Sequence, residues 1–170
     1  MSKDRSVFIG LCNPKSPENV GSVLRAAGCY QAGEVRYIGE RFSRASKYST
    51  DTKNINNSIP LTQVDDLLHD LPAGMRVVCV ELAEGAVSLP SFVHPERAIY
   101  IFGPEDGSIP QQVIDKADAV VYVPTIGCMN LAATVNVVLY DRLAKSDLQI
   151  DDVERIKSSR DVNNRLVVRS

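Results

Sequence analysis

Three polar turns hold the side chains of this chain that could take part in chemistry. Residues 13–19 end with Asn19, residues 103–110 contain Glu105, and residues 124–130 end with Asn130. Each turn follows an apolar, strand-like run and leads into a helix-like run. In an open α/β sheet such turns lie at the carboxyl ends of the strands, where ligands bind. We therefore expect the three turns to converge on one crevice.

The first turn leads to a carboxamide and a guanidinium. Asn19 stands at the expected start of a helix, where an asparagine either caps the helix or faces a ligand. Arg25 follows within the same helix. Such an arginine either forms a surface salt bridge or grips a phosphate through its planar fork.

The second and third turns narrow the kind of ligand. The second is neither G-x-G-x-x-G nor a Walker loop, which disfavours a dinucleotide or a nucleoside triphosphate. Glu105 and Asp106 would repel phosphate. They suit either a neutral or cationic ligand or the positive end of the helix that begins near Ile109. In the third turn Asn130 is again either a cap or a contact, and Cys128 before a helix could be a low-pKa thiolate. No histidine stands near Cys128 in the sequence, which disfavours a cysteine nucleophile.

Apolar runs and helical spacing predict the elements that would position these turns. Strands are expected at residues 6–12, 34–39, 76–82, 98–103 and 119–124, and helices at 20–30, 64–71, 109–117 and 130–145. Their alternation predicts an α/β fold with a parallel sheet covered on both faces. Residues 40–60 form either a functional loop or short local structure. The helix at 130–145 is apolar around most of its circumference, so it should be buried against the sheet and another surface, for which a second subunit is a good candidate.

Composition places the chain among soluble globular domains. It has 170 residues, of which 44% are hydrophobic and 24% charged, and a formal net charge of -2, which fits one domain with a sizeable core. A nucleic-acid partner would therefore have to meet local positive charge. Basic residues gather at 36–53 and again at 155–169. Each cluster is either a solvated loop or a site of phosphate contact.

The cysteines and histidines of the chain indicate its redox environment and whether it could bind a metal. None of the four cysteines has C-x-x-C spacing, and neither histidine has metal-ligand company nearby. This pattern predicts reduced thiols and no metal. The start of the chain has no apolar signal region, and no stretch approaches transmembrane length. We therefore expect a cytoplasmic protein with no membrane partner.

Together the three turns resemble a known set of motifs. These are Asn19-x-Gly21-x-x-x-Arg25, then Phe102-Gly103-Pro104-Glu105-x-x-x-Ile109-Pro110, then Pro124 through Cys128-Met129-Asn130-Leu131-Ala132. Their order and spacing are similar to the three motifs of the SpoU/TrmH family of the SPOUT superfamily, which are RNA ribose 2′-O-methyltransferases that use S-adenosylmethionine. The resemblance covers roughly residues 6 to 145. It is greatest to the minimal, single-domain members that act on tRNA.

The resemblance implies a fold and an assembly. The fold would be α/β, with a mostly parallel sheet, helices on both faces and a C-terminal trefoil knot. The methyltransferase domain would span residues 1–146, followed by a polar C-terminal extension at 147–170. Family members work as homodimers, and S-adenosylmethionine would lie in the knot. The expected partner is RNA, and tRNA in particular.

The resemblance also implies roles for single residues. Arg25 occupies the position of the family's catalytic arginine, and the other motif positions give Asn19, Glu105 and Asn130. The cofactor would be held mainly by backbone groups of Val80, Glu81, Leu82, Gly103, Pro104, Glu105, Val123, Thr125, Gly127, Met129 and Leu131. At its motif position Arg25 is also an expected RNA contact, and the basic stretch at 36–53 adds Arg41, Arg44 and Lys47.

Two departures from the family pattern keep an alternative open. Cys128 stands where the family usually has serine, and the loop between Pro124 and Cys128 is shorter than expected. A thiol is a weak hydrogen-bonding group, which favours a catalytically weak or inactive RNA-binding protein on the same scaffold. The intact Asn19, Arg25 and Asn130 favour the enzyme. A nucleotide-binding domain of ordinary doubly wound type is disfavoured, because a phosphate loop with Lys-Ser/Thr is missing.

Overall fold

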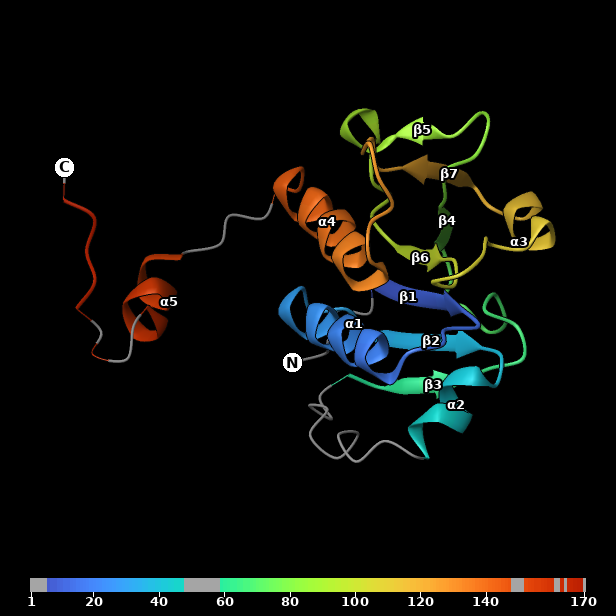
Figure 1. The fold of residues 1–170 in the computed structure, drawn as a ribbon. Helices are drawn as coiled ribbons and strands as arrows, with labels where there is room; N and C mark the ends of the chain where they lie inside the picture. The colour runs from blue at the N-terminus through green and yellow to red at the C-terminus, as the bar shows by residue number, and fades with distance from the viewer. Residues whose placement is uncertain (1–5, 48–58, 148–151, 161–162, 164, 170) are drawn as a thin grey trace.

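A computed structural model describes residues 6–47, 59–147, 152–160, 163 and 165–169. Within them the chain forms a parallel sheet of seven strands in the order β3-β2-β1-β6-β4-β7-β5 (Figure 1). The strands are β1 (Val7–Cys12), β2 (Glu34–Ile38), β3 (Leu61–Gln63), β4 (Arg76–Val80), β5 (Val87–Ser88), β6 (Ala98–Phe102) and β7 (Ala119–Tyr122). Every neighbouring pair among them is parallel. The predicted α/β class with a parallel sheet is confirmed.

The central strands are apolar on both sides because helices or turns cover both faces of the sheet. All residues of β1 and of β6 are buried. Close packing explains the glycine at position 10 of β1. An added Cβ there would lie 3.2 Å from Ile101 Cγ1 and 3.4 Å from Leu67 Cδ1. The missing side chain lets Leu67 reach the sheet.

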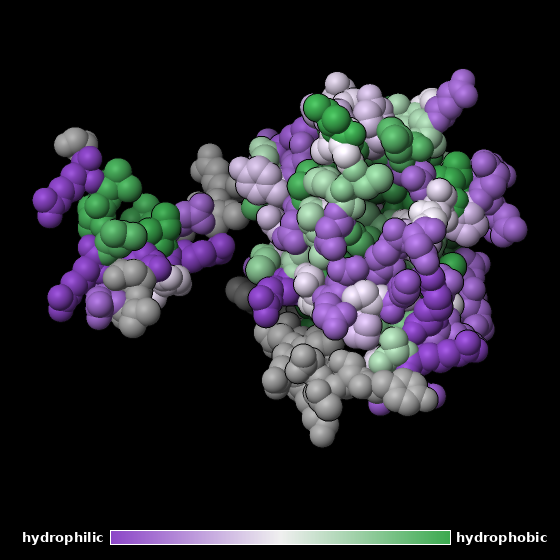
Figure 2. Space-filling model, viewed as in Figure 1, coloured by the Kyte–Doolittle hydropathy of each residue, from purple (hydrophilic) through white to green (hydrophobic). Residues whose placement is uncertain are grey.

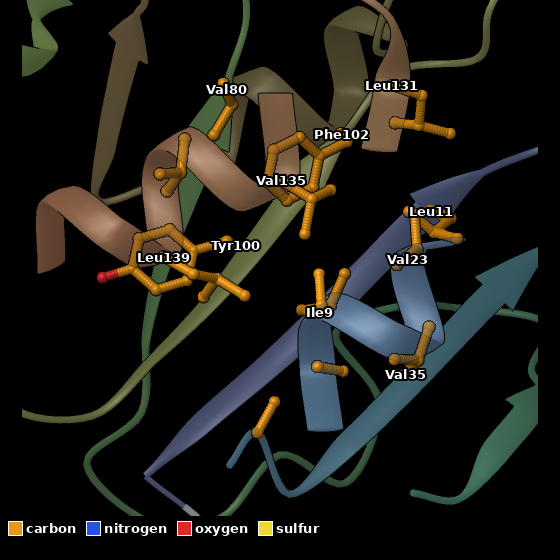
Figure 3. Close-up of a cluster of buried hydrophobic side chains, with 14 of the residues drawn as sticks. Ile9, Leu11, Val23, Val35, Val80, Tyr100, Phe102, Leu131, Val135 and Leu139 are labelled. Atoms are coloured by element: carbon orange, nitrogen blue, oxygen red, sulfur yellow. The ribbon is translucent and has the colours of Figure 1, made fainter. Parts of the chain in front are cut away.

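Two long helices cover one face of the sheet. They are α1 (Pro17–Cys29) and α4 (Leu131–Ala144), and they pack against each other. Figure 3 shows their side chains Val23, Val135 and Leu139 above Ile9 and Tyr100 of the sheet. Burial of such aliphatic side chains stabilises the fold by roughly 1.5–3 kcal/mol each. This packing fixes the amino ends of both helices at the carboxyl edge of the sheet.

The other face is covered by shorter segments. Helix α3 (Gln111–Asp115) and the turns at 64–71 pack against Phe8, Cys79 and Ile101. Helix α2 (Arg41–Ser46) follows β2, and a single 3-10 turn, η2 (Leu89–Ser91), follows β5. The prediction of cover on both faces is therefore confirmed.

The predicted helix at 64–71 is wrong, because these residues form turns. Arg36 of β2 explains the difference. Its buried guanidinium donates from Nη1 to the carbonyl oxygens of Leu67 (3.3 Å) and His69 (2.8 Å), and from Nη2 to Glu34 (3.0 Å). Carbonyl groups that would accept hydrogen bonds within a helix are therefore bound to the side chain of Arg36. The hydrophobic periodicity of residues 64–71 cannot show such a contact, because Arg36 is distant in the sequence.

The C-terminal region differs from the rest of the chain. Every described residue from Ala144 onward is exposed, including those of α5 (Asp152–Ser159). Figure 2 shows apolar side chains, in green, on this tail. The exposed apolar residues there include Val153, Ile156 and Val168. The division of the chain at 146/147 and the trefoil knot stay predictions. None of the helices in the described part of the chain is both long and apolar enough to cross a membrane.

A polar cluster fastens the carboxyl end of α4 to the sheet. The side chain of His94 is 6% exposed and lies between the Tyr100 hydroxyl (2.7 Å from Nδ1) and the Asp141 carboxylate (2.7 Å from Nε2). Tyr100 also accepts a hydrogen bond from Arg142 (3.0 Å). Neutral His94 satisfies the cluster if Tyr100 donates to Nδ1 and Nε2 donates to Asp141. Burial lowers the pKa of His94, although Asp141 opposes this effect.

Replacement of His94 should therefore change how stability depends on pH. The pKa of His94 is lower in the folded state than the ordinary value of 6.5. The folded state therefore loses stability as pH falls below 6.5, and for one proton the free energy of unfolding falls by at most about 1.4 kcal/mol per pH unit. In His94→Gln the amide can make both hydrogen bonds without titrating. Urea unfolding at several pH values between 7.5 and 5 should show a shallower decline in the free energy of unfolding for the variant. Equal declines for the two proteins would contradict the assignment.

Candidate active site

The three polar turns lie along one edge of the sheet. Strands β1, β6, β4 and β7 are neighbours in that order, and all run in the same direction. Their carboxyl ends therefore lead into adjacent turns, which carry Asn13–Ser16, Glu81–Leu82, Gly103–Ser108 and Val123–Asn130. The convergence predicted from the sequence is thus a consequence of strand order.

The Glu105 carboxylate joins the turn after β6 to the start of α1. Its Oε2 accepts a hydrogen bond from the backbone N–H of Lys15 (2.9 Å), and its Oε1 accepts from that of Ser16 (3.1 Å). Asn19 Nδ2 donates to the same Oε1 (3.2 Å). A carboxylate is favourable here because the N–H groups at a helix start carry partial positive charge and lack helical partners.

These hydrogen bonds set the ionisation of Glu105. Burial by itself would raise its pKa, but hydrogen bonds from its own backbone, from Ser16, from the Asn19 side chain and from Lys15 outweigh burial. The pKa of Glu105 is therefore below its ordinary value, and the group is a carboxylate near neutral pH. With three donors already bound, it serves better as an anchor than as a proton acceptor.

Asn19 and Asn130 extend the connection to the third turn. Asn130 Nδ2 donates to Asn19 Oδ1 (3.0 Å), while Asn130 Oδ1 accepts from the backbone N–H groups of Ala132 (2.9 Å) and Ala133 (3.2 Å). Asn130 therefore caps α4 and contacts Asn19 at once. Helix α1 is capped by Ser16 instead, which leaves the Asn19 side chain available. We call the set Glu105–Asn19–Asn130 the carboxamide bridge.

Arg25 lies apart from the carboxamide bridge within one chain. It is exposed on α1, about 9 Å further along the helix axis than Asn19 at 1.5 Å per residue. No hydrogen bond or ion pair joins its guanidinium to another residue in the described ranges. Of the predicted catalytic residues, the structure thus brings Asn19, Glu105 and Asn130 together and leaves Arg25 separate.

The predicted cofactor residues after β4 and β6 form a compact turn. Glu81 accepts hydrogen bonds from the backbone N–H groups of Leu82 (3.1 Å) and Ile109 (3.0 Å). Gly103 is close to the same carboxylate, since an added Cβ would lie 3.4 Å from Glu81 Oε2 and 3.2 Å from the Ile109 nitrogen. Val80 is buried, whereas Leu82 is 81% exposed. Sequence reasoning assigned Glu81 by its backbone and missed this carboxylate, although Glu81 is the first polar residue after a buried strand.

The predicted cofactor residues after β7 form a loop that is held by internal hydrogen bonds and exposed to solvent at its tip. The Thr125 N–H donates to the Val123 carbonyl oxygen (2.8 Å), and Thr125 Oγ1 donates to that of Gly127 (2.8 Å). Ile126 at its tip is fully exposed. The side chain of Leu131 belongs to the core, so only its backbone could meet a ligand.

The predicted RNA contacts divide into two kinds. Arg44 and Lys47 of the α2 region are exposed, and Arg44 pairs with Glu40 on its own helix (2.7 Å). Arg41 instead donates to both carboxylate oxygens of Asp106 (2.8 and 2.9 Å) and to the Asn13 carbonyl oxygen (2.7 Å). The guanidinium of Arg41 is therefore already engaged. Lys53, from the same basic stretch, lies outside the described residues.

The charges at this edge suit a cationic ligand better than a phosphate. Glu81, Glu105 and Asp106 bring three carboxylates, against the cations Arg41, which pairs with Asp106, and Lys15, whose charge also acts on Asp106. The exposed Leu82 and Ile126 offer apolar surface for a flat ring. The donor set thus fits a molecule that combines a positive centre with an apolar ring.

Nucleophilic and metal chemistry find little support. Cys128 is exposed, but both ring nitrogens of His94 are bound to Tyr100 and Asp141, and His69 pairs with Asp70. Burial raises the pKa of Cys12, and likewise that of Cys79, to about 12, so both thiols stay protonated. Within the part of the chain that the structure describes, no group of three or more His, Cys, Asp or Glu residues could hold a metal ion.

Glu105→Gln should weaken the connection between the turns. The amide leaves one of the two backbone N–H groups at the start of α1 without an acceptor, so we expect a loss of about 1 kcal/mol in the free energy of unfolding at pH 7. Because the pKa of Glu105 is lowered, the loss should be complete above pH 4.5 and shrink as pH falls through the folded-state pKa. Urea unfolding measures it, with Glu84→Gln as the exposed control. A loss that persists unchanged in acid would contradict a role for the carboxylate charge.

Comparisons with known proteins agree with this geometry. The sequence matches the SpoU rRNA Methylase family over residues 6–140, while no curated protein matches the chain. An rRNA methyltransferase from Sinorhizobium meliloti superposes with a TM-score of 0.66 and 22% identity, covering 84% of this chain and 57% of that one. Its AdoMet-bound structure gives a TM-score of 0.65, 22% identity and coverage of 82% and 56%. The chain thus spans just over half the length of these two structures.

Two further solved structures share the fold over most of their own length. A TrmH/SpoU tRNA modifying enzyme from A. aeolicus has a TM-score of 0.65 and 14% identity, covering 91% of this chain and 86% of that one. A structure that concerns 2-OH methylation of C/U34 on tRNA has a TM-score of 0.63 and 24% identity, with coverage of 81% and 93%. The family match spans most of the chain and includes all three polar turns, so this protein belongs to the SpoU rRNA Methylase family.

Proposed function

We propose that this protein transfers a methyl group from S-adenosylmethionine to a ribose 2′-hydroxyl of RNA, with tRNA as the substrate class. The observation that carries the proposal is the carboxamide bridge, which joins the three motif turns at one edge of the sheet through Glu105, Asn19 and Asn130. Family membership supports methyl transfer to RNA. The AdoMet-bound relative and the relative associated with 2-OH methylation of tRNA support the cofactor and the acceptor.

The residues at this edge of the sheet fit this cofactor. S-adenosylmethionine supplies a methyl group on a positively charged sulfur, next to an adenine ring. The turns that would hold it are those after β4, β6 and β7, with Glu81, Gly103 and Thr125 among their residues. The surplus of carboxylates favours a sulfonium, and the exposed Leu82 and Ile126 favour a flat ring.

The protein's main task in this reaction is alignment, which can supply about 7–11 kcal/mol of the barrier. Asn19 and Asn130 would orient the ribose and the loop beside it. Arg25 would fix the adjacent phosphate and stabilise the charge that develops on the attacking oxygen. A guanidinium rarely releases its proton, so the hydroxyl proton would pass to phosphate or water.

A homodimer would let Arg25 act at this site. Within one chain Arg25 lies beyond the carboxamide bridge, so we propose that its guanidinium reaches the crevice of a second copy. The face of α4 that is turned away from the sheet supports this arrangement, because Val137 is 37% and Tyr140 is 60% exposed there. Apolar side chains in that position are typical of a surface that a partner covers.

Arg25→Ala should abolish turnover by removing this charge, with a fall of about a hundredfold or more. Transfer of labelled methyl from S-adenosylmethionine to total RNA of a strain lacking the gene measures turnover, and calorimetry measures cofactor binding. We expect cofactor binding to survive. Arg25→Lys is the matched control, since it keeps the charge but loses the fork.

The outcomes separate the rival functions. Loss of cofactor binding in Arg25→Ala would make Arg25 a structural residue. If the wild-type protein itself fails to bind S-adenosylmethionine, the alternative holds, namely an RNA-binding protein on a methyltransferase scaffold.

Neutral residues at positions 44 and 47 should weaken RNA binding. Arg44 and Lys47 are the exposed cations of the α2 region, and each phosphate contact that is lost lowers the slope of log affinity against log salt by about 0.7–0.9. Filter binding of tRNA across a salt series should show a smaller slope for Arg44→Gln/Lys47→Gln than for the wild type. Arg76→Gln serves as the control, because Arg76 lies at the amino end of β4, away from the carboxyl ends of the strands. An unchanged slope would exclude α2 from the RNA interface.

A further inference from the structure

The Arg41–Asp106 ion pair lies directly beside the carboxamide bridge. Arg41 Nη1 and Nη2 donate to the two Asp106 oxygens at 2.8 and 2.9 Å, which is the geometry of a bidentate pair. Asp106 follows Glu105 in the chain. An arginine at the start of α2 is therefore bound to the same turn that supplies the anchor of the bridge.

Arg41 also holds the turn after β1. Its Nη2 donates to the Asn13 carbonyl oxygen at 2.7 Å, and its Nε is buried without a partner among the described residues. The Asn13 N–H in turn donates to the Ile38 carbonyl oxygen at 2.8 Å. Three turns, after β1, β2 and β6, are thus connected through one guanidinium.

The backbone near Arg41 is adapted to this connection. Asn13 has a φ of 43° and Gly39 a φ of 91°, both in the left-handed region. A Cβ at Gly39 would collide with the Asn13 side chain. Glycine at position 39 is therefore required for the turn after β2 to pass so close to the turn after β1.

The electrostatics of the pair are mutually stabilising. The hydrogen bonds from Arg41 hold the pKa of Asp106 below its ordinary value, and Asp106 raises the pKa of Arg41. A phosphate that bound Arg41 would have to displace Asp106 and leave its charge beside Glu105. Arg41 is also less accessible than Arg44, with 34% against 74% of the side chain exposed.

We propose that Arg41 is a positioning residue and not a residue that binds RNA. It holds the Gly103–Ser108 turn against the turn after β1, so that Glu105 keeps its hydrogen bonds to the backbone N–H groups of Lys15 and Ser16. Its consequence for catalysis rests on the function proposed above. When Arg41 releases Asp106, the Glu105 anchor loosens, and Asn19 and Asn130 lose their fixed geometry. A shift of about 1 Å in such groups can slow a reaction by about a hundredfold.

The first test needs no activity. Hydrogen–deuterium exchange of the full chain, read on peptides that contain Lys15 and Ser16, reports whether Glu105 still protects their amides. Arg41→Gln and Asp106→Asn should each speed this exchange by up to about tenfold, the equivalent of one hydrogen bond. Arg76→Gln, which breaks an exposed ion pair with Asp118, should leave it unchanged. Wild-type exchange in both Arg41→Gln and Asp106→Asn would overturn the proposal.

The second test uses Asp106 to separate positioning from RNA contact. If Arg41 bound phosphate, Asp106→Asn would free its guanidinium and strengthen RNA binding. The positioning role predicts that Asp106→Asn and Arg41→Gln each lower kcat by about tenfold to a hundredfold with the salt slope of tRNA binding unchanged. Arg41→Lys should resemble Arg41→Gln, because lysine cannot make the bidentate contact. The double variant should be no worse than Arg41→Gln, because Arg41→Gln already removes the contact with Asp106.

The two tests fail in different ways. A wild-type protein that neither binds S-adenosylmethionine nor methylates RNA would defeat the proposed function, while the exchange result would still decide whether Arg41 holds the turn. An active wild type with undiminished kcat in Asp106→Asn, or a salt slope that falls in Arg41→Gln, would overturn the positioning role alone.

Discussion

The Glu105 carboxylate accepts two backbone N–H groups at the start of α1 and the carboxamide of Asn19. The first N–H groups of a helix have no partners within it and need an acceptor from elsewhere. Here part of that need is met by a residue about 90 positions further along the chain. The local cap, Ser16, does not involve the turn after β6, whereas the contact with Glu105 fixes that turn to α1. Through Asn19 the same carboxylate is connected to Asn130, the cap of α4, so the arrangement of the three turns depends on it.

The parts of the fold that depend on local pattern could be predicted from the sequence. The buried strands β1 and β6 stand out as continuous apolar runs, and Asn130 stands directly before the helix that it caps. Parallel strands present their carboxyl ends at one edge of the sheet, and that rule predicted that the three polar turns would lie at the same edge. The contacts among Asn19, Glu105 and Asn130 depend in addition on the strand order, in which β1 and β6 are neighbours, and the local pattern does not predict that order. Strands β3 and β5 are too short, at 3 and 2 residues, to leave such a pattern.

The arginines show why the rest could not be predicted. Arg36, Arg41 and Arg44 belong to one basic stretch of the sequence, yet each has a different role. Arg36 is buried under the turns at 64–71, Arg41 is bound to Asp106, and Arg44 faces solvent. A guanidinium chooses among carbonyl, carboxylate and water according to what the fold brings within reach. Such partners are distant in sequence, and neither spacing nor composition identifies them.

The central claim is that this edge of the sheet carries out methyl transfer to a ribose of RNA. The most direct measurement is mass spectrometry of nucleosides from the tRNA and rRNA of a strain that lacks the gene. The account predicts that one 2′-O-methylated nucleoside disappears from tRNA and returns when the wild-type gene is restored. An unchanged set of 2′-O-methylated nucleosides in both RNA fractions would contradict it.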